Sequence, residues 1–374
     1  MLRIYVHVGV PKTGTTYLQD VLFRNRRELA RAGVLYPAAY PEEHFDAVVD
    51  LRDMTFGGFE DPDLRGRWER LARSATRWRG HTVVLSHELL AGADADAVAA
   101  ATYSLAGHEV HVVLTARDLG QQVPAMWQEY VKNHSTVEFA AYAERLTRAP
   151  RKGKAALVFW RQQHIVEVLR RWSANVPDDR LHVVTVPPPG SEPALLWRRF
   201  AAAIGLSAEE YDSTPAARNS SLGFTETELL RRVNKALGDS LEWPAYEATV
   251  KNWFAEELLT SGPLSTRPVV PDELRPFFDT CARDMIDDLT TWGLPVEGAL
   301  ADLRPRWPDP ATGTVEDDAV LDTAVGAVAT LLRERADLHW TGRGGQLVRR
   351  ARRSPAVRRL PLPVQEWLKR RANA

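Results

Sequence analysis

The chain has little cysteine, no long apolar run and no excess of charge, and each shortage excludes a class of protein. Cys281 is the single cysteine, so no disulfide can form within the chain, which fits a reducing compartment. No apolar run approaches the roughly 18–20 residues that a membrane-spanning helix needs. The first residues lead almost at once into a strand pattern, which leaves no room for a signal peptide. The sequence therefore predicts a cytoplasmic protein.

Neither sign of charge dominates the composition. Lys and Arg number 48 and Asp and Glu number 49 among 374 residues, so the net charge gives no reason to expect a polyanionic partner. The sequence also shows no internal repeat, no metal-ligand cluster and no zinc-like spacing of His and Cys. We therefore expect neither a nucleic-acid partner nor a metal site. The oligomeric state does not follow from the sequence.

Short apolar runs alternate with helical patterns over residues 1–206. Strands are expected at Arg3–Val8, Thr82–Ser86, Glu109–Thr115 and Leu181–Val186. Such β-α alternation predicts an α/β fold with a doubly wound, P-loop-like parallel sheet flanked by helices. In sheets of this kind, ligands bind beyond the carboxyl ends of the strands. The residues that follow each strand are therefore the first candidates for function.

Helical patterns separate the strands and continue after them. The expected helices are Thr16–Ala32, Leu64–Trp78, Ala93–Ala106, Val123–Lys132, Gln162–Ala174, Pro193–Ile204, Glu226–Leu237, Tyr246–Leu259, Asp272–Thr291 and Asp318–Arg333. We expect one domain over residues 1–300, with the α/β core in 1–206 and a helical part in 207–300 packed on the sheet. Residues 301–317 are rich in Pro, Asp and Gly and predict a linker. Residues 318–374 then form a helical, basic C-terminal extension.

A glycine-containing turn joins the first strand to the next helix. Gly9 and Gly14 allow backbone conformations and close approaches that a Cβ would resist. A helix that begins near Thr15 offers free N–H groups and the positive end of its dipole. Lys12 adds a mobile positive charge, and neighbouring threonines add hydroxyl donors. The turn therefore predicts a site for phosphate or a phosphate-like group, rather than a plain strand–helix connection without a ligand.

The turn nearly matches the nucleotide-binding pattern G-x-x-x-x-G-K-[ST], but threonine follows the second glycine and the lysine lies inside the loop. The run Pro-Lys-Thr-Gly-Thr-Thr resembles the 5′-phosphosulfate loop of bacterial-type sulfotransferases that use 3′-phosphoadenosine 5′-phosphosulfate (PAPS). The resemblance covers about residues 1–225. It implies that Lys12 is drawn toward the bridging oxygen and helps sulfate leave. The donor-binding residues that it implies are Pro11, Lys12, Thr13, Gly14, Thr15, Thr16 and Arg117.

The second expected strand is followed by two ionisable residues, His87 and Glu88. Both follow a neighbouring strand end, so either could supply the base that an attacking hydroxyl or amine requires. In several carbohydrate and protein sulfotransferases a Glu shortly after this strand has that role, and in the small-molecule branch a His has it. By this resemblance Glu88 is the first choice and His87 the second. Capping of the next helix is the simpler role open to each.

The third expected strand ends before Arg117, whose planar guanidinium is suited to clamp a second phosphate. The segment resembles the 3′-phosphate segment of sulfotransferases, in which a Ser follows the Arg by eight residues. Ala125 stands at that position, so one hydroxyl contact is expected to be missing, at a cost of roughly 0.5–1.5 kcal/mol. Gln121 or Gln122 is a candidate to compensate. A plain salt bridge with Asp118 is the alternative role for Arg117.

The resemblance implies transfer of a sulfuryl group from PAPS to a hydroxyl or amine of an acceptor, and we expect no metal requirement. The acceptor is left open among carbohydrates, lipids and natural products. One alternative is a phosphotransferase that uses ATP or GTP, which would need Mg²⁺ and an Asp at a strand end that the sequence lacks. Another is a non-catalytic nucleotide-binding module.

The C-terminal part offers weaker signals. Arg218, Asn219 and Ser220 resemble an Asn-x-Ser-Leu-Gly run of bacterial sulfotransferases and are candidates for the 3′ side of the nucleotide or for helix capping. Arg267 and Lys251 are candidates to complete the nucleotide or acceptor site. Residues 349–371 carry nine basic residues and one acid. Such a tail is usually solvated, and the alternative is a peripheral contact with an anionic membrane or protein.

Overall fold

The computed structural model describes residues 1–149, 151, 153–215, 222–308 and 315–340, with side chains up to residue 336. The chain divides into two compact units, Met1–Thr314 and Val315–Ala374. The first unit contains the sheet and the site described below. The second contains one described helix, α14 (Asp317–Trp340).

Six parallel strands form one sheet in the order β2-β3-β1-β4-β5-β6. The strands are β1 (Arg3–Gly9), β2 (Val34–Leu35), β3 (Thr82–Ser86), β4 (Glu109–Ala116), β5 (Leu181–Thr185) and β6 (Val296–Glu297). The α/β fold with a doubly wound parallel sheet is thus confirmed. The four expected strands are present within a residue at each end. Sequence reasoning missed β2 and β6, because two residues are too few to show a periodic pattern.

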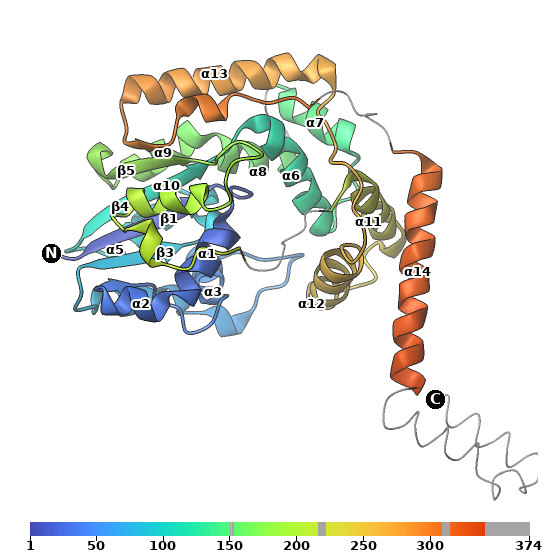
Figure 1. The fold of residues 1–374 in the computed structure, drawn as a ribbon, viewed down its shortest axis with the longest axis horizontal. Coiled ribbons are helices and arrows are strands. Elements are labelled where there is room, and N and C mark those ends of the chain that lie inside the picture. The colour runs from blue at the N-terminus through green and yellow to red at the C-terminus, as the bar shows by residue number, and fades with distance from the viewer. Residues whose placement is uncertain (150, 152, 216–221, 309–314, 341–374) are drawn as a thin grey trace, which may run out of the picture. The chain divides into compact units, whose positions relative to one another are not determined.

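Helices surround the sheet, and α13 runs along the top of the view in Figure 1. The α-helices of the first unit are α1 (Thr15–Arg24), α2 (Arg26–Arg31), α3 (Glu43–Leu51), α4 (Arg67–Thr76), α5 (Ala95–Ser104), α6 (Leu119–Lys132), α7 (Phe139–Thr147), α8 (Lys154–Gln163), α9 (Ile165–Ser173), α10 (Leu195–Ala203), α11 (Phe224–Leu237), α12 (Trp243–Tyr246) and α13 (Arg275–Trp292). A 3₁₀ turn covers Glu88–Gly92, and a π-helix covers Glu247–Leu258. No helix within the described ranges combines the length and apolarity needed to cross a bilayer.

Apolar packing fixes α1, the helix that follows the predicted anion loop. Leu18, Val21 and Leu22 on one side of α1 are fully buried in a cluster with strand residues such as Tyr5 and Val113. Residues of α10, including the phenylalanine at position 200, complete the same cluster. Burying each such side chain contributes roughly 1.5–3 kcal/mol. The start of α1 is therefore held rigidly over the end of β1.

Several expected helices differ from the structure in their bounds, and three of them have an identifiable cause or form. The pattern Thr16–Ala32 forms two helices, because Asn25 bonds to the backbone of Asp212 in both directions, at 2.9 and 3.0 Å. The helix expected from Val123 begins at Leu119, with the Asp118 side chain accepting from the N–H of residue 121. The third, expected over 246–259, is mostly the π-helix.

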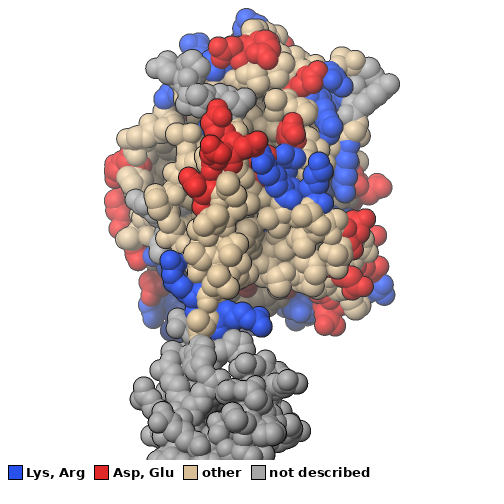
Figure 2. Space-filling model, turned by 90° about the vertical axis from the view of Figure 1, so that its right-hand side faces the viewer, with Lys and Arg blue, Asp and Glu red and all other residues tan. Residues whose placement is uncertain are grey.

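Charges of both signs are mixed on the surface of the molecule. Figure 2 shows one face on which groups of Lys and Arg side chains lie directly beside groups of Asp and Glu. This mixing agrees with a composition of 48 basic and 49 acidic residues. Local fields around particular sites, rather than the net charge, therefore decide which ligands the protein attracts.

Candidate functional site

The loop after β1 lies at the carboxyl edge of the sheet, between the two strands that neighbour β1. His7 pairs with Ser86 of β3, and Gly9 pairs with Leu114 of β4. The carboxyl ends of these three strands are therefore adjacent, and the segments that follow them meet. This edge is where parallel α/β sheets bind ligands.

The backbone of the loop requires its two glycines. Gly9, Lys12 and Gly14 have left-handed φ values of 78°, 67° and 86°. A Cβ at position 9 would lie 2.7 Å from the Cα of Glu88, and one at position 14 would lie 2.5 Å from Cδ2 of Leu196. No side chain caps the N-terminus of α1, so the N–H groups of its first turn are available to an anion.

A buried hydrogen-bond network supports the loop from below. The hydroxyl of Thr13 donates to the carbonyl of Val10 and lies 2.6 Å from Oγ1 of Thr115. His7 connects Thr115 to Ser86, with its ring nitrogens 3.1 and 2.7 Å from the two hydroxyls. Burial lowers the pKa of His7 to about 3, so the ring is neutral at physiological pH. The Thr13 hydroxyl thus braces the loop, and its backbone N–H is the group left for a bound anion.

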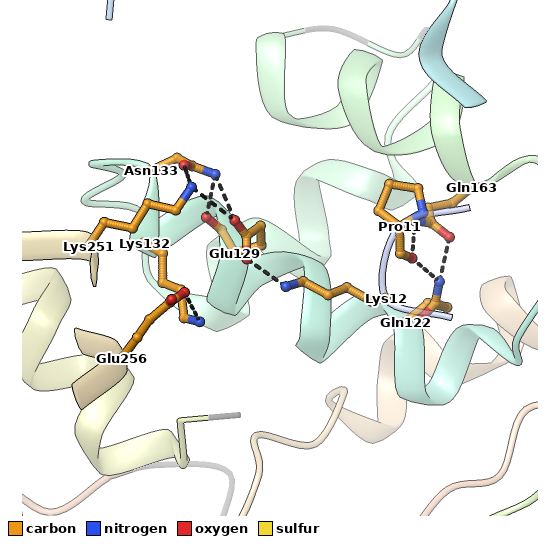
Figure 3. Close-up of polar contacts among 9 residues, drawn as sticks. All are labelled: Pro11, Lys12, Gln122, Glu129, Lys132, Asn133, Gln163, Lys251 and Glu256. Atoms are coloured by element: carbon orange, nitrogen blue, oxygen red, sulfur yellow. Dashed lines mark hydrogen bonds and ion pairs between the residues drawn. The ribbon is translucent and has the colours of Figure 1, made fainter. Parts of the chain in front are cut away.

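Two buried glutamines hold the loop from the side of α6 and α8. Nε2 of Gln122 donates to the carbonyl of Pro11 and to Oε1 of Gln163, both at 2.8 Å (Figure 3). Nε2 of Gln163 donates to the same carbonyl at 3.3 Å. Pro11 therefore contributes to the site by fixing the loop through its carbonyl.

The two threonines that begin α1 differ in exposure. Thr15 is 3% exposed, and its Oγ1 has no hydrogen-bond partner among the described residues. An unsatisfied buried hydroxyl costs about 1–3 kcal/mol, and a ligand in the loop is one way to satisfy it. Thr16 is exposed and lines a pocket together with Glu88.

Lys12 reaches from the loop to α6. Its ammonium lies 2.6 Å from Oε2 of Glu129, as Figure 3 shows. Burial disfavours the charged ammonium, but the attraction of Glu129 outweighs burial, and Glu88 adds to it, so the pKa of Lys12 is raised. Lys12 is therefore a fixed positive charge at the loop. Sequence reasoning missed Glu129, although its position one helical turn after Ala125 on the same helix was available as a signal.

A second lysine approaches the same carboxylate. Nζ of Lys251, on the π-helix, lies 3.6 Å from Oε1 of Glu129 and 3.0 Å from Oδ1 of Asn133. Lys132 pairs with Glu256 beside them at 2.9 Å (Figure 3). The predicted candidate Lys251 thus belongs to this cluster, which joins the loop to α6 and the π-helix.

Arg117 lies at the mouth of the loop. Its Nη1 is 3.5 Å from the carbonyl of Lys12, and its Nη2 donates to Oε1 of Gln121 at 3.1 Å. Arg267, which precedes α13, approaches the same Oε1 at 3.4 Å. Within the described ranges neither guanidinium forms an ion pair with a carboxylate, so the salt bridge to Asp118 is not present. Two cations that share one neutral oxygen make this spot a candidate for binding an anion.

Burial tends to lower the pKa of Arg117, but a guanidinium stays protonated at physiological pH. Ala125 lies on α6 after this pair and offers no hydroxyl. Gln121, one of the two glutamines that we considered as compensation, is the residue between the arginines. Gln122 instead fixes the loop.

Glu88 lies directly against the start of the loop, since its Cα and Cβ occupy the space beside Gly9. Its Oε2 has no hydrogen-bond partner in the part of the chain that the structure describes. Glu88, His87 and Thr16 line a pocket of about 350 Å³. A carboxylate oxygen without a partner, beside a pocket and a fixed positive charge, is suited to accept a proton.

His87 is buried, and burial lowers its pKa, so the ring is neutral at physiological pH. Its Nδ1 accepts the backbone N–H of Leu89 at 3.2 Å. A neutral imidazole whose Nδ1 is an acceptor carries its proton on Nε2. His87 therefore caps the 3₁₀ turn and presents a donor, whereas Glu88 presents an acceptor.

Fold and site together describe an α/β protein with a glycine-containing loop, a candidate anion site, at the carboxyl edge of a parallel sheet. Comparison with known families finds no match, and comparison with characterised proteins finds none either. Among solved structures, a sulfotransferase from Alicyclobacillus acidocaldarius is similar, with 14% identity and a TM-score of 0.38 over 65% of this chain and 98% of the other. A likeness at this level does not establish a function.

Some sequence candidates lie outside the described residues. Arg218, Asn219 and Ser220 fall in the range 216–221, and the basic segment 349–371 falls in the range 341–374. Within the described ranges no group of three or more His, Cys, Asp or Glu side chains is placed to hold a metal ion. The site is therefore built from the loop, Arg117 with Arg267, and Glu88.

Proposed function

We propose that this protein is a cytoplasmic sulfotransferase that moves a sulfuryl group from PAPS to a hydroxyl or amine of an acceptor. The observation that carries the proposal is the contact between Arg117 and the carbonyl of Lys12. This contact brings the two proposed anion sites together at one edge of the sheet. PAPS carries phosphosulfate at its 5′ end and a separate phosphate at its 3′ carbon, so two adjacent anion sites suit it.

The residues present fit the donor. The backbone at Gly9 and Gly14 leaves no room for side chains, and Thr15 keeps a buried hydroxyl without a partner. The loop amides, Lys12 and the threonine hydroxyls would hold the 5′ end and stabilise charge on the leaving phosphate. Arg117 and Arg267 would hold the 3′-phosphate and fix the donor's register. PAPS supplies the activated sulfuryl group.

Glu88 would take the proton of the acceptor group. Glu88 lines the pocket next to the loop, and its buried Oε2 has no hydrogen-bond partner among the described residues. His87 is less suited to this step, because the N–H of Leu89 already occupies its only basic nitrogen. The geometry therefore supports the first of the two candidate bases.

Calorimetric titration with 3′-phosphoadenosine 5′-phosphate (PAP), ATP and GTP tests the proposal. We expect PAP to bind with micromolar affinity in the absence of Mg²⁺. Its affinity should be higher than that of ATP or GTP. Micromolar binding of ATP that depends on Mg²⁺, with no binding of PAP, would instead support a phosphotransferase and end the proposal.

The arginine pair gives the same test a residue-level control. A hydrogen bond to a charged group contributes about 1.5–3 kcal/mol. The substitutions Arg117→Ala and Arg267→Ala should therefore each lower the affinity for PAP roughly 10- to 100-fold. Arg73→Ala removes an exposed arginine of α4 and should leave PAP affinity unchanged. Equal PAP affinity in all four proteins would remove the arginine pair from the donor site.

A further inference from the structure

The pocket beside Glu88 has a chemical character that points to one class of acceptor. It holds about 350 Å³ and lies between α1, the segment before α3 and the end of β3. Its lining residues are Thr16, Gln19, Asp20, Phe23, Pro41, Glu42, Phe45, His87 and Glu88. This volume is at the lower end for sites that enclose small organic molecules.

All charged side chains of the lining are acidic. Asp20, Glu42 and Glu88 contribute carboxylates, and no Lys or Arg is among the lining residues. Arg24 compensates only Asp20, at 3.0 Å. Glu42 is exposed and forms no ion pair within the described ranges. The pocket therefore carries a negative field next to a loop that carries a positive one.

Two unpartnered polar groups support a ligand in this pocket. Oε2 of Glu88 is buried and has no partner among the described residues. His87 is 8% exposed, and its Nε2, the protonated nitrogen, has no hydrogen bond in the same part of the chain. Glu88 and His87 are neighbours in the chain and both line the pocket, so together they offer an acceptor and a donor to a hydroxyl, which both gives and takes a hydrogen bond.

Aromatic rings contribute an apolar wall. Phe23 and Phe45 both line the pocket, and the Phe45 ring packs 5.5 Å from the ring of His87. Aromatic faces attract both apolar rings and cations. The guanidinium of Arg26 already lies 4.0 Å from the centre of the Phe23 ring, so Phe45 is the better candidate to receive a ligand. The lining thus combines a hydroxyl-binding pair, two aromatic rings and an excess of negative charge.

We propose that the acceptor is a small hydroxyl compound that carries a protonated amine and an aromatic or apolar body. Its hydroxyl would lie at Glu88 and His87, and its ammonium would be held by Glu42. The inference rests on the proposed function for the identity of the reacting group. The charge preference itself rests on the pocket alone and is measurable without any donor.

Three probes with one aromatic hydroxyl and different charges test the preference. Tyramine carries an ammonium, 4-ethylphenol is neutral and 4-hydroxyphenylacetate is anionic. Calorimetric titration of the full chain at pH 7 should give affinities that fall in this order, with tyramine at least tenfold tighter than 4-ethylphenol. Equal affinity of the first two, or tightest binding of the anionic probe, would overturn the proposal.

Variants identify the groups responsible. Glu42→Gln should reduce the preference for tyramine over 4-ethylphenol several-fold, and Glu42→Lys should abolish or reverse it, while 4-ethylphenol binding stays constant. Glu69→Gln removes an exposed charge from α4 and should keep the full preference. An unchanged preference in Glu42→Lys would contradict the proposal.

A parallel PAP titration of each variant separates this proposal from the proposed function. If PAP binds but the three phenols bind equally, only the acceptor class is wrong. If tyramine is preferred but PAP does not bind, the pocket is correctly described and the sulfotransferase proposal fails.

Discussion

Glu129, whose side chain is 25% exposed, keeps its negative charge because Lys12 and Lys251 pair with it and Lys132 adds to their attraction. Burial alone would raise its pKa, but Lys12, Lys251 and Lys132 together outweigh burial and hold the pKa of this carboxyl well below its usual range. A carboxyl with a depressed pKa stabilises the native state above its unfolded pKa of about 4.3. That stability is lost as the pH falls toward the folded value.

Glu129→Gln should therefore lower the free energy of unfolding at pH 7 by about 1–3 kcal/mol, because two ammonium groups lose their shared partner. The difference in the free energy of unfolding between Glu129→Gln and the unsubstituted protein should become smaller below about pH 4.3. Urea unfolding at pH 7 and at pH 3.5 measures it. Glu69→Gln, which removes a partner of the exposed Arg73, should cost under about 1 kcal/mol at either pH. If the loss of unfolding free energy in Glu129→Gln were the same at both pH values, the lowered pKa of Glu129 would be contradicted.

Glu88→Gln separates catalysis from binding. The amide keeps the shape of the side chain but has no basic oxygen of comparable strength, so turnover should fall about 10²- to 10⁴-fold, the usual range for a general base. PAP affinity should change little, because Glu88 lies on the acceptor side of the loop. Transfer of labelled sulfate from PAPS and calorimetry measure the two quantities. Full activity would move the role of base to His87 or elsewhere.

Sequence reasoning located most of the candidate site because its residues follow strands. Gly9, Arg117 and Glu88 each come directly after a β pattern, and the topology then brings them together. Arg267 was a candidate without an assigned partner and Glu129 was missed, because contacts across helices and long connections depend on tertiary packing. The sequence also did not predict that the Thr13 hydroxyl bonds within the protein, because its partner Thr115 comes from another strand.

At the scale of elements, the loop between β1 and α1 depends on Gly9. Alanine there must adopt a left-handed φ, at about 1–2 kcal/mol, and its Cβ would also meet backbone and side-chain atoms of Glu88 at 2.7 Å. Gly107 has a similar φ of 85°, but nothing lies within 4 Å of its missing Cβ. Gly107→Ala is therefore a control: it has the same backbone strain from a left-handed φ but no steric clash of the added Cβ.

Gly9→Ala should thus lower the melting temperature more than Gly107→Ala and should also weaken PAP binding. Gly107→Ala should show the smaller thermal shift and bind PAP normally. Differential scanning calorimetry with and without PAP gives both results. Equal shifts in the two variants would mean that the loop can move away from Glu88 at no cost.

The π-helix Glu247–Leu258 shows where a helical pattern misleads. The sequence predicts an ordinary helix over 246–259, because local propensity does not distinguish the two forms. In a π-helix the hydrogen bonds join residues i and i+5. Two residues that are five apart therefore lie more nearly on the same face than they do in an α-helix. Lys251 and Glu256 are five apart, and both pair with residues at the end of α6. Tertiary pairing, rather than propensity, accounts for this element.

At the scale of the whole molecule, the site belongs to one of the two compact units. Every group assigned to donor or acceptor lies within Met1–Thr314. A chain that ends at Thr314 should therefore bind PAP within about twofold of the full chain. Calorimetry on both chains, with circular dichroism as the control for folding, tests this. Loss of PAP binding by a folded truncated chain would show that the second unit contributes to the site.

The same two chains test the basic C-terminal segment, for which membrane or protein contact remains a prediction. If residues 349–371 bind an anionic surface, the full chain should sediment with vesicles that contain phosphatidylserine and should dissociate as salt is added. The chain that ends at Thr314 should not sediment. Equal sedimentation of both chains would exclude the segment as the cause.

The loop is made from the first residues of the chain, but distant residues complete it. Leu196 fills the space beside Gly14, and Arg267 shares an oxygen with Arg117. A chain still emerging from the ribosome therefore carries an unfinished cup until more than 250 further residues have been added. If the loop binds a nucleotide as proposed, that binding can begin only when synthesis is well advanced, so it reports on completed folding rather than on the presence of the loop alone.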